Sequence, residues 1–561
     1  MKRRGLTGGA ARLAAALAGA ASVWTAFAQT VPLPPTIDPG RIQERLEPPR
    51  VPRGAEIPEL KGPEREPPDA LKAVRVTLKS IRLEGASAPL AAQLQAHADR
   101  YVGREITVAE IFELARALTA IYRSAGYILS QVIVPPQSLS DGVLTLRVIE
   151  GYISNVRIEG DADARRTLAE LGEKIKASRP LHAAVLERYL LIGNELPGIQ
   201  LRSVLAPSQT PGAADLILIA SAKRVEGYVS LDNYGSRYLG TGQLSAGVAV
   251  NRLAGDDQLR VLATAAGDSE MGFGEIAYSR LLNSEGLRLG ASASSTHTRP
   301  GDALEPFEIR GRADTASLSL GYPFLRTRNS SLLGRALLDY RDIDTDILGT
   351  RVIEDRIRAL RLGLAWLSLD RFAGQNTFYV EASQGLGGTK ADDPLKSRAG
   401  ADGKFTKASF DYVRFQPLGG NFGVTLGAGG QWTDEPLLSS EQFALGGRRF
   451  GRAYEPAEIV GDRALAARIE PAYFGRAGGI VQSWQLYGFW DGGKVWYDDP
   501  PGSQRPAQSL ASAGFGTRLF AARNVSATLE AAWPLTRPVA SRVADGEGND
   551  MRILGSIVAR F

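Results

Sequence analysis

The last residues of the chain decide the fold class of most of the protein: Met551-Arg552-Ile553-Leu554-Gly555-Ser556-Ile557-Val558-Ala559-Arg560-Phe561. Successive side chains of an extended strand point to opposite faces. One face carries Met551, Ile553, Gly555, Ile557, Ala559 and Phe561. The other carries Arg552, Ser556 and Arg560, together with Leu554 and Val558. Apolar side chains that alternate with polar ones up to a terminal aromatic residue predict a strand of a transmembrane β-barrel. A soluble β-sandwich, which would bury the apolar face, is the alternative.

The same alternation recurs from about Val225 to the end. In one segment Val525, Ala527, Leu529, Ala531 and Trp533 lie opposite Asn524, Ser526, Thr528 and Glu530. Sixteen segments of this kind begin near Val225, Gly242, Gln258, Met271, Leu287, Gly311, Ser330, Asp355, Asn376, Lys404, Asn421, Arg463, Gln482, Ser509, Asn524 and Met551. An even number of antiparallel strands is typical of bacterial barrels. We therefore predict a sixteen-stranded transmembrane β-barrel over residues 225–561.

Residues 1–28 predict an export signal. Basic residues precede an apolar stretch centred on Leu13–Ala21, and Ala26-Phe27-Ala28 supplies a cleavage site before Gln29. An uncleaved membrane anchor is the alternative. The segment also accounts for four of the five net positive charges of the chain, so the remainder offers no basic surface for nucleic acid.

The composition argues against an enzyme. The chain has no Cys and only three His residues, which excludes disulfide scaffolds, zinc clusters and thiol nucleophiles. Residues 488–494 match the spacing G-x-x-x-x-G-K, but Val495 stands where a Mg²⁺-binding hydroxyl should be, and the segment alternates as a strand. We expect no catalytic residue, no metal and no cofactor.

Residues 29–75 hold 11 of the 31 prolines and predict an extended linker. One helix signal interrupts it over about residues 38–47. Asp38 can cap the helix, Pro39 suits its first turn, and Ile42 and Leu46 stand four residues apart. A short amphipathic helix on a tether is expected here, with a transient helix in a disordered leader as the alternative.

An internal repeat follows the linker. Residues 81–85 match residues 156–160, and residues 150–154 match residues 226–230, at offsets of 75 and 76. Two matches at nearly one period predict two tandem modules over residues 76–150 and 151–224.

Each module has the pattern β-α-α-β-β. The first is expected to use Val76–Glu84, Leu90–Val102, Val108–Ser124, Leu129–Val134 and Gly142–Ile149. The second is expected to use Val156–Glu159, Leu168–Ile175, Leu181–Ile192, Ile199–Leu205 and Asp215–Ala220. A three-stranded sheet covered by two helices leaves open edges, which can accept an added strand.

The Gly-rich loop between the eleventh and twelfth barrel strands runs from Leu445 to Pro456 and on to Asp462. Its arginines, Arg448, Arg449 and Arg452, need acceptors if the loop folds away from water. Asp491 alternates with Trp490 on the thirteenth strand, so it faces the lumen if the tryptophan faces lipid. These residues suggest an ion pair inside the barrel. A solvated loop, and an aspartate that meets lumenal water, are the alternatives.

Two β-α-α-β-β modules before a sixteen-stranded barrel resemble the polypeptide-transport-associated (POTRA) architecture of two-partner secretion transporters, the TpsB-type haemolysin secretion/activation family. Residues 194–198, 231–236 and 446–462 are similar as well. The resemblance covers essentially the whole mature chain.

In that family the equivalent loop carries a Val-Arg-Gly-Tyr tetrad that folds into the lumen, where its arginine pairs with an aspartate on the barrel wall. The matching residues here are Gly451, Arg452, Ala453 and Tyr454, so the first and third positions depart from the pattern. The resemblance implies that Arg452 pairs with Asp491, with Arg448 or Arg449 as substitutes. It also implies that Asp38–Glu47 is a plug inside the barrel.

The resemblance further implies a bacterial outer-membrane transporter. POTRA modules in the periplasm would capture one large unfolded β-rich exoprotein (TpsA-type) by strand addition, and the barrel would secrete it without ATP. Its surroundings would be outer-membrane lipid, with periplasmic chaperones as possible further partners. The alternatives are a barrel-assembly or insertase factor of the same superfamily, a passive porin and a soluble adhesin. The identity of the exoprotein, its activation and the oligomeric state stay open.

Overall fold

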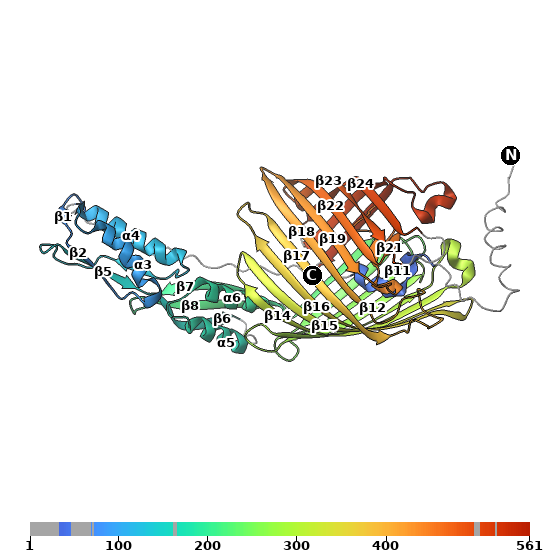
Figure 1. Ribbon diagram of the computed structural model, residues 1–561, viewed down its shortest axis with the longest axis horizontal. Coiled ribbons are helices and arrows are strands. Elements are labelled where there is room, and N and C mark those ends of the chain that lie inside the picture. The colour runs from blue at the N-terminus through green and yellow to red at the C-terminus, as the bar shows by residue number, and fades with distance from the viewer. Residues whose placement is uncertain (1–32, 47–68, 70–71, 161–164, 499–504, 522–523) are drawn as a thin grey trace.

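The computed structural model describes residues 33–46, 69, 72–160, 165–498, 505–521 and 524–561. The expected export signal, and most of the linker between residues 47 and 71, lie outside these residues. Two small modules follow one another and lead to a large barrel (Figure 1). None of the helices in the described ranges combines the length and the apolar character needed to cross a bilayer.

The first module packs two helices on a small sheet. Its helices are α3 (Ala88–Ala98) and α4 (Val108–Ser124), and its sheet has the order β2-β5-β4, with β2 parallel to β5. A capping box starts α4, because the Thr107 hydroxyl accepts from the Glu110 amide while the Glu110 carboxylate accepts from the Thr107 amide. The strands are β1 (Arg75–Thr77), β2 (Ser80–Glu84), β3 (Glu105–Thr107), β4 (Gln131–Ile133) and β5 (Val143–Ile149).

The predicted continuous strand Val76–Glu84 is wrong, because the chain changes partner in its middle. β1 pairs with β3, which the sequence pattern did not indicate, whereas β2 pairs with β5. Leu78 and Ile81 are both buried although they are three residues apart, so the alternation slips by one residue between them. At the slip, the carbonyl of Gly142 accepts from the amides of both Lys79 and Ser80.

The second module repeats the arrangement with the sheet order β6-β8-β7. Its helices, α5 (Arg165–Lys176) and α6 (Ala183–Asn194), cover one face of the sheet. The strands are β6 (Tyr152–Gly160), β7 (Ile199–Pro207) and β8 (Ala213–Ala222). In both modules the outer strands of the three-stranded sheet pair on one side only within the described residues.

Sixteen of the remaining strands close into one antiparallel barrel, in which β26 returns to β9. The predicted fold class, two β-α-α-β-β modules before a sixteen-stranded barrel, is confirmed. The barrel strands are β9 (Val225–Asp232), β10 (Gln243–Asn251), β11 (Asp257–Ala266), β12 (Met271–Leu281), β13 (Arg288–Thr298), β14 (Arg310–Arg326), β15 (Ser330–Ile347), β16 (Thr350–Leu369), β17 (Gln375–Gly388), β18 (Thr406–Gly419), β19 (Phe422–Thr433), β22 (Arg463–Arg476), β23 (Val481–Trp496), β24 (Ala507–Ala521), β25 (Val525–Pro534) and β26 (Arg552–Arg560).

Strand starts agree with the sequence pattern to within two residues, with one exception. β16 starts at Thr350 rather than near Asp355, because β15 and β16 stay paired up to a tight turn at Leu348 and Gly349. Both turn residues have positive φ, 49° and 75°, which is the geometry of a short hairpin turn.

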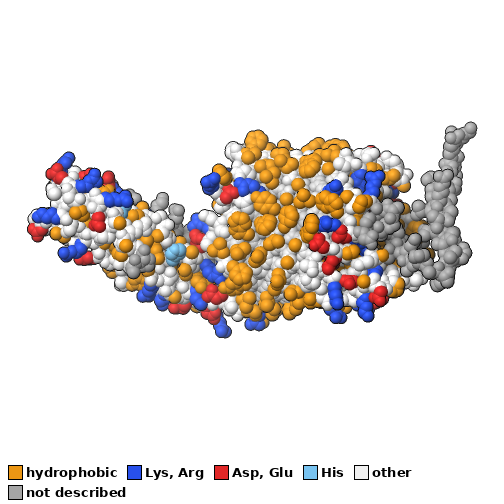
Figure 2. Space-filling model, in the orientation of Figure 1, with side chains coloured by type: hydrophobic (Ala, Val, Ile, Leu, Met, Phe, Trp, Pro, Cys, Tyr) orange, Lys and Arg blue, Asp and Glu red, His pale blue; other side chains and the backbone are white. Residues whose placement is uncertain are grey.

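The barrel wall is apolar outside and polar inside. Apolar side chains gather over the outer wall in Figure 2, whereas charged side chains concentrate on the modules and at the barrel ends. Trp490 is 42% exposed whereas the adjacent Asp491 is 0% exposed, and Leu529 and Glu530 show the same contrast at 55% and 5%. A soluble sandwich would bury this apolar surface, so the pattern supports a membrane barrel.

Two segments of the chain occupy the barrel interior. The first is residues 33–46, here called the plug segment, which forms 3-10 turns at Pro35–Ile37 and Pro39–Arg41 and then α2 (Ile42–Leu46) (Figure 1). Ile37 and Ile42 pack with Leu262 and Phe273, which point inward from β11 and β12. The second is residues 434–462 between β19 and β22, here called the lumenal loop.

The second module is fixed on the turns at one end of the barrel. Leu281, at the end of β12, is a member of the module's own apolar core. Around it, Arg326 Nε donates to Glu195 Oε1 at 2.6 Å, Lys174 Nζ lies 2.9 Å from Glu285 Oε1, and Arg188 donates to the Pro323 carbonyl. The module and the barrel therefore form a continuous packed unit.

Replacing Leu281 with Asp should detach the second module from the barrel. An unpaired carboxylate in an apolar core costs several kcal/mol and opposes the packing of the joint. Lys223 and Arg224 lie at the joint, where Lys223 donates to the Gly198 carbonyl, so trypsin should cut the variant there at least several-fold faster. Leu282→Asp is the control, because Leu282 is 47% exposed. Equal cleavage of both variants would contradict the packing role of Leu281.

Candidate functional site

The lumenal loop is a compact hairpin. β20 (Phe443–Leu445) pairs antiparallel with β21 (Ile459–Gly461), and the tip between them folds back on itself. The Gly446 amide donates to the Phe450 carbonyl at 2.8 Å, and the Tyr454 amide donates to the Gly451 carbonyl at 2.9 Å. This folding carries the tip, including Arg452, into the barrel interior.

The Arg452 side chain lies among three carboxylates of the barrel wall. Its Nη2 donates to Glu470 Oε2 at 2.8 Å, its Nη1 donates to Glu530 Oε1 at 3.0 Å, and its Nε lies 2.9 Å from Asp491 Oδ2. The carboxylates come from β22, β25 and β23. The guanidinium also lies 4.0 Å from the centre of the Phe489 ring and is almost fully buried. We call Arg452, Glu470, Asp491 and Glu530 the arginine clamp.

Asp491 holds the loop backbone as well as the guanidinium. Its Oδ1 accepts from the amides of Gly451 at 2.7 Å and Arg452 at 3.2 Å, and from the Ser512 hydroxyl. The contact of Oδ2 with Arg452 Nε has the distance of an ion pair without hydrogen-bond geometry. Asp491 therefore fixes the direction of the chain at the loop tip.

Two neighbouring residues donate hydrogen bonds to the carboxylates of the clamp. Arg518 donates to Glu470 at 2.6 Å, and Tyr487 donates to Glu530 at 2.7 Å. Burial alone would lower the pKa of Arg452, but Glu530, Asp491 and Glu470 outweigh this and raise the pKa above its ordinary value. Removing one partner from such a buried set leaves uncompensated charge and costs about 3–5 kcal/mol.

Tyr454 fastens the other side of the loop tip. Its ring is fully buried, and its hydroxyl lies 3.2 Å from the Ala511 carbonyl and 3.1 Å from the Arg537 carbonyl. These carbonyls belong to β24 and to the loop after β25. Arg452 and Tyr454 thus hold the tip to adjoining parts of the same wall.

The two other arginines of the loop lie outside the clamp. Arg448 is exposed and stacks on the Tyr234 ring at 4.2 Å, whereas Arg449 is exposed and pairs with Asp411 of β18. The structure brings Arg452, rather than either neighbour, to Asp491.

The departures from the family tetrad have a structural account. Gly451 has φ +89°, and a Cβ added there would lie 2.5 Å from Leu510 Cδ1, so this position requires glycine. Ala453 is not among the residues with positive φ. The left-handed residue of this tetrad is therefore the first, and alanine fits at the third.

Sequence reasoning missed the clamp roles of Glu470 and Glu530. Both occupy inward positions of spanning strands, and Glu530 already alternates with Leu529 in the sequence. A carboxylate on a lumenal face is a usable signal, but its strand partners were needed to select these two. The register places Arg468 opposite Asp491, which brings β22 and β23 together at the clamp.

The fold defines a class, the outer-membrane β-barrels with POTRA domains. The model of the POTRA domain, ShlB-type, matches residues 76–151, and that of the haemolysin secretion/activation protein ShlB/FhaC/HecB matches residues 216–519, more than half of the chain. The chain belongs to this haemolysin secretion/activation family, a family of transporters rather than enzymes. Its barrel lies in the outer membrane and its modules in the periplasm.

Curated relatives and a solved structure are similar to the chain. The heme/hemopexin transporter protein HuxB of Haemophilus influenzae is 26% identical over 360 residues, which span 62% of this chain and 63% of HuxB, less than two thirds of its length. The outer membrane transporter CdiB of Dickeya dadantii is 24% identical over 498 residues, 84% of this chain and 85% of that protein. The structure of CdiB from Escherichia coli has a TM-score of 0.71 at 21% identity, covering 91% of this chain and 94% of that one, which shows a shared fold.

Gly451→Val, which installs the family residue at the first tetrad position, should destabilise the folded loop. A β-branched residue at positive φ is strained by about 1–3 kcal/mol, and the added side chain meets Leu510. The temperature at which the folded band converts to the unfolded band on a detergent gel should fall. Ala453→Gly should leave it nearly unchanged. A stable Gly451→Val barrel would contradict the assigned loop geometry.

Proposed function

We propose that the protein secretes one large β-rich exoprotein across the outer membrane by two-partner secretion. The observation that carries the proposal is a barrel whose interior is occupied by two segments of its own chain, held by non-covalent apolar and polar contacts, with two POTRA modules at its mouth. Contacts of this kind can exchange for water or for a passing polypeptide. The relatives named as transporters support the same activity.

The modules, residues 76–150 and 151–224, would capture the unfolded exoprotein in the periplasm. The strands at the sheet edges, β2 and β4 in one module and β6 and β7 in the other, carry backbone groups that an extended segment can pair with. Periplasmic chaperones would deliver the exoprotein in an extended state. The modules would therefore bind extended segments through backbone hydrogen bonds, with little dependence on the amino-acid sequence of the segment.

The barrel, residues 225–561, would be the conduit, embedded in outer-membrane lipid. The plug segment would leave the lumen, since few side-chain hydrogen bonds tie it to its surroundings: Arg41 Nη1 donates to the Gln442 carbonyl at 3.0 Å, Gln43 donates to Glu275 at 3.3 Å and Ser439 donates to Asp38 Oδ2 at 2.7 Å. The arginine clamp would keep the barrel in a translocation-competent shape. In this proposal the protein is a transporter, not an enzyme, and folding of the exoprotein outside supplies direction without ATP or a cofactor.

One observation favours the alternative of a barrel-assembly factor. The register of the seam between β9 and β26 pairs Tyr228–Asp232 with Ser556–Arg560 and is the shortest in the barrel, although backbone hydrogen bonds from Gly227 to Phe561 and from Asn233 to Gly555 extend it at each end. A short seam is the line along which a barrel opens at least cost, and an open edge can template another strand. Export remains the first proposal, because two modules are few for an assembly factor.

Comparing culture supernatants and outer-membrane proteomes with and without the gene tests the proposal. Loss of one large secreted protein with an intact membrane proteome is the expected result. Broad depletion of other barrels would instead assign the chain to barrel assembly. No change in either fraction would favour a passive channel.

Arg452→Ala should reduce secretion at least tenfold while the barrel still reaches the membrane, because the cation that balances three carboxylates is lost. Arg452→Lys should restore secretion only in part, since an ammonium cannot bridge three acceptors as a planar guanidinium does. The readout is the secreted exoprotein on an immunoblot, with heat-modifiable migration as the check on folding.

Arg448→Ala is the matched control, because Arg448 is exposed in the same loop. If Arg448→Ala abolishes secretion and Arg452→Ala leaves it intact, the functional arginine is misassigned.

A further inference from the structure

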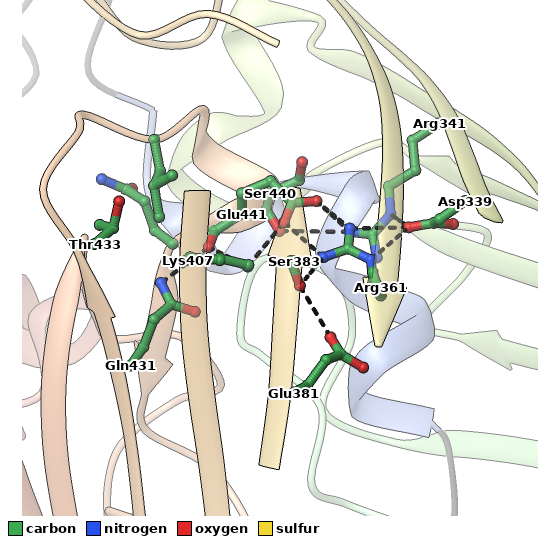
Figure 3. A network of polar contacts seen from close by, with 12 residues as sticks. Asp339, Arg341, Arg361, Glu381, Ser383, Lys407, Gln431, Thr433, Ser440 and Glu441 are labelled. Carbon is green, nitrogen blue, oxygen red and sulfur yellow. Dashed lines mark hydrogen bonds and ion pairs between the residues drawn. The ribbon is translucent and has the colours of Figure 1, made fainter. Parts of the chain in front are cut away.

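A second buried charge cluster lies inside the barrel, away from the arginine clamp (Figure 3). At its centre is Glu441, which is 1% exposed and lies in the lumenal loop, in the 3-10 turn Ser439–Glu441. Arg361 donates to both of its carboxylate oxygens, at 2.7 and 3.1 Å, and Lys407 Nζ lies 2.8 Å from it. Arg341 lies 3.5 Å away.

Asp339 completes the cluster from the wall. It accepts from Arg361 at 2.9 Å and from Arg341 at 3.0 Å, so a carboxylate of the wall holds both arginines as well. Burial alone would raise the pKa of Glu441, but the cations of Arg361, Lys407 and Arg341 outweigh this and hold the pKa well below its ordinary value. Glu441 is therefore a buried carboxylate surrounded by the side chains of Arg341, Arg361 and Lys407, which together with Asp339 we call the socket.

The socket and the arginine clamp lie on different strands of the barrel wall. The socket side chains come from β15, β16 and β18, whereas the clamp uses β22, β23 and β25. In the closed strand order β19 separates β18 from β22. The lumenal loop is thus fastened by charge to two parts of the wall, through Glu441 and through Arg452.

The loop residues beside Glu441 hold the plug segment. Ser439 donates to Asp38 Oδ2 at 2.7 Å, and the Gln442 carbonyl accepts from the buried Arg41. A Cβ added at Gly40 would lie 3.0 Å from Ser440 Cβ and 2.5 Å from Ile343 Cδ1, so the two segments are in direct contact. We call residues 439–442 the plug seat. Glu441 turns its carboxylate to the wall while its neighbours face the plug.

We propose that Glu441 is a positioning residue for the closed state: its ion pairs with β16 and β18 hold the plug seat, and the seat holds the plug segment in the lumen. The proposal rests on the proposed function only in taking the lumen as a passage that the plug closes. The arginine clamp shapes the loop tip, whereas Glu441 sets whether the passage is blocked.

The test is ion conductance of the purified full-length protein in planar lipid bilayers, which needs no exoprotein. Glu441→Gln keeps the shape of the side chain but removes the charge that three cations share, so the open fraction should rise by about an order of magnitude. Glu435→Gln is the matched control. Glu435 is exposed in the same loop and accepts from the Thr406 amide, which a glutamine carbonyl can also do. It should conduct like the unmodified protein.

A second variant leaves the barrel wall and the loop untouched. Gly40→Leu places a side chain where Ser440 and Ile343 already lie, and should displace the plug even if Glu441→Gln fails to assemble. Because both changes release the same contact, the double variant should conduct no more than the stronger single variant.

A disulfide crosslink distinguishes release of the plug segment from a general loosening of the barrel. The chain has no native Cys, so Asp38→Cys with Ser439→Cys, at two positions whose side chains already meet at 2.7 Å, forms the only thiol pair. Oxidation of this pair in the Glu441→Gln background should close the pore, and a reducing agent should reopen it. The proposal is overturned if Glu441→Gln conducts no more than Glu435→Gln, if Gly40→Leu stays closed, or if the oxidised crosslink leaves conductance unchanged. Loss of secretion with normal gating would instead concern the proposed function alone.

Discussion

The guanidinium of Arg452, enclosed by Glu470, Asp491 and Glu530, is the contact on which the barrel interior depends. Three carboxylates at this spacing would repel one another in a medium of low dielectric, and one cation that donates to two of them and pairs with the third reduces the conflict. Because the cation sits on a loop and the anions sit on three strands, local charge balance requires the loop to be inside. The loop in turn supplies the surface on which the plug segment rests.

The alternation of apolar and polar side chains predicted much of the fold, and it failed where the chain changed its strand partner. Alternation located the sixteen barrel strands because each spanning strand has one lipid face and one lumenal face. It failed at Lys79 and Ser80, where the chain leaves one small sheet and joins another. A pattern of side chains records which face is buried, but not which strand supplies the partner hydrogen bonds.

In the site, too, the side-chain pattern indicated which residues are buried but not which residues they contact. Asp491 could be placed on the lumenal face from its tryptophan neighbours, and the family tetrad pointed to Arg452. Glu470, Glu530 and Glu441 are equally buried, yet their partners come from strands up to a hundred residues away in the sequence. Resemblance also failed to anticipate that the glycine with positive φ would be Gly451 rather than the third residue of the tetrad.

Leu281 belongs to the core of the second module and to strand β12 at once, and that double membership has a mechanical consequence. A polypeptide that pulls on the module pulls on β12 at its base. Higher on the same strand, Phe273 packs with the plug segment and Glu275 accepts from Gln43. In the proposed function, tension on the module would therefore reach β12 among the strands at the joint, and through β12 the wall that the plug segment contacts, so the load itself would act as the signal that an exoprotein has arrived.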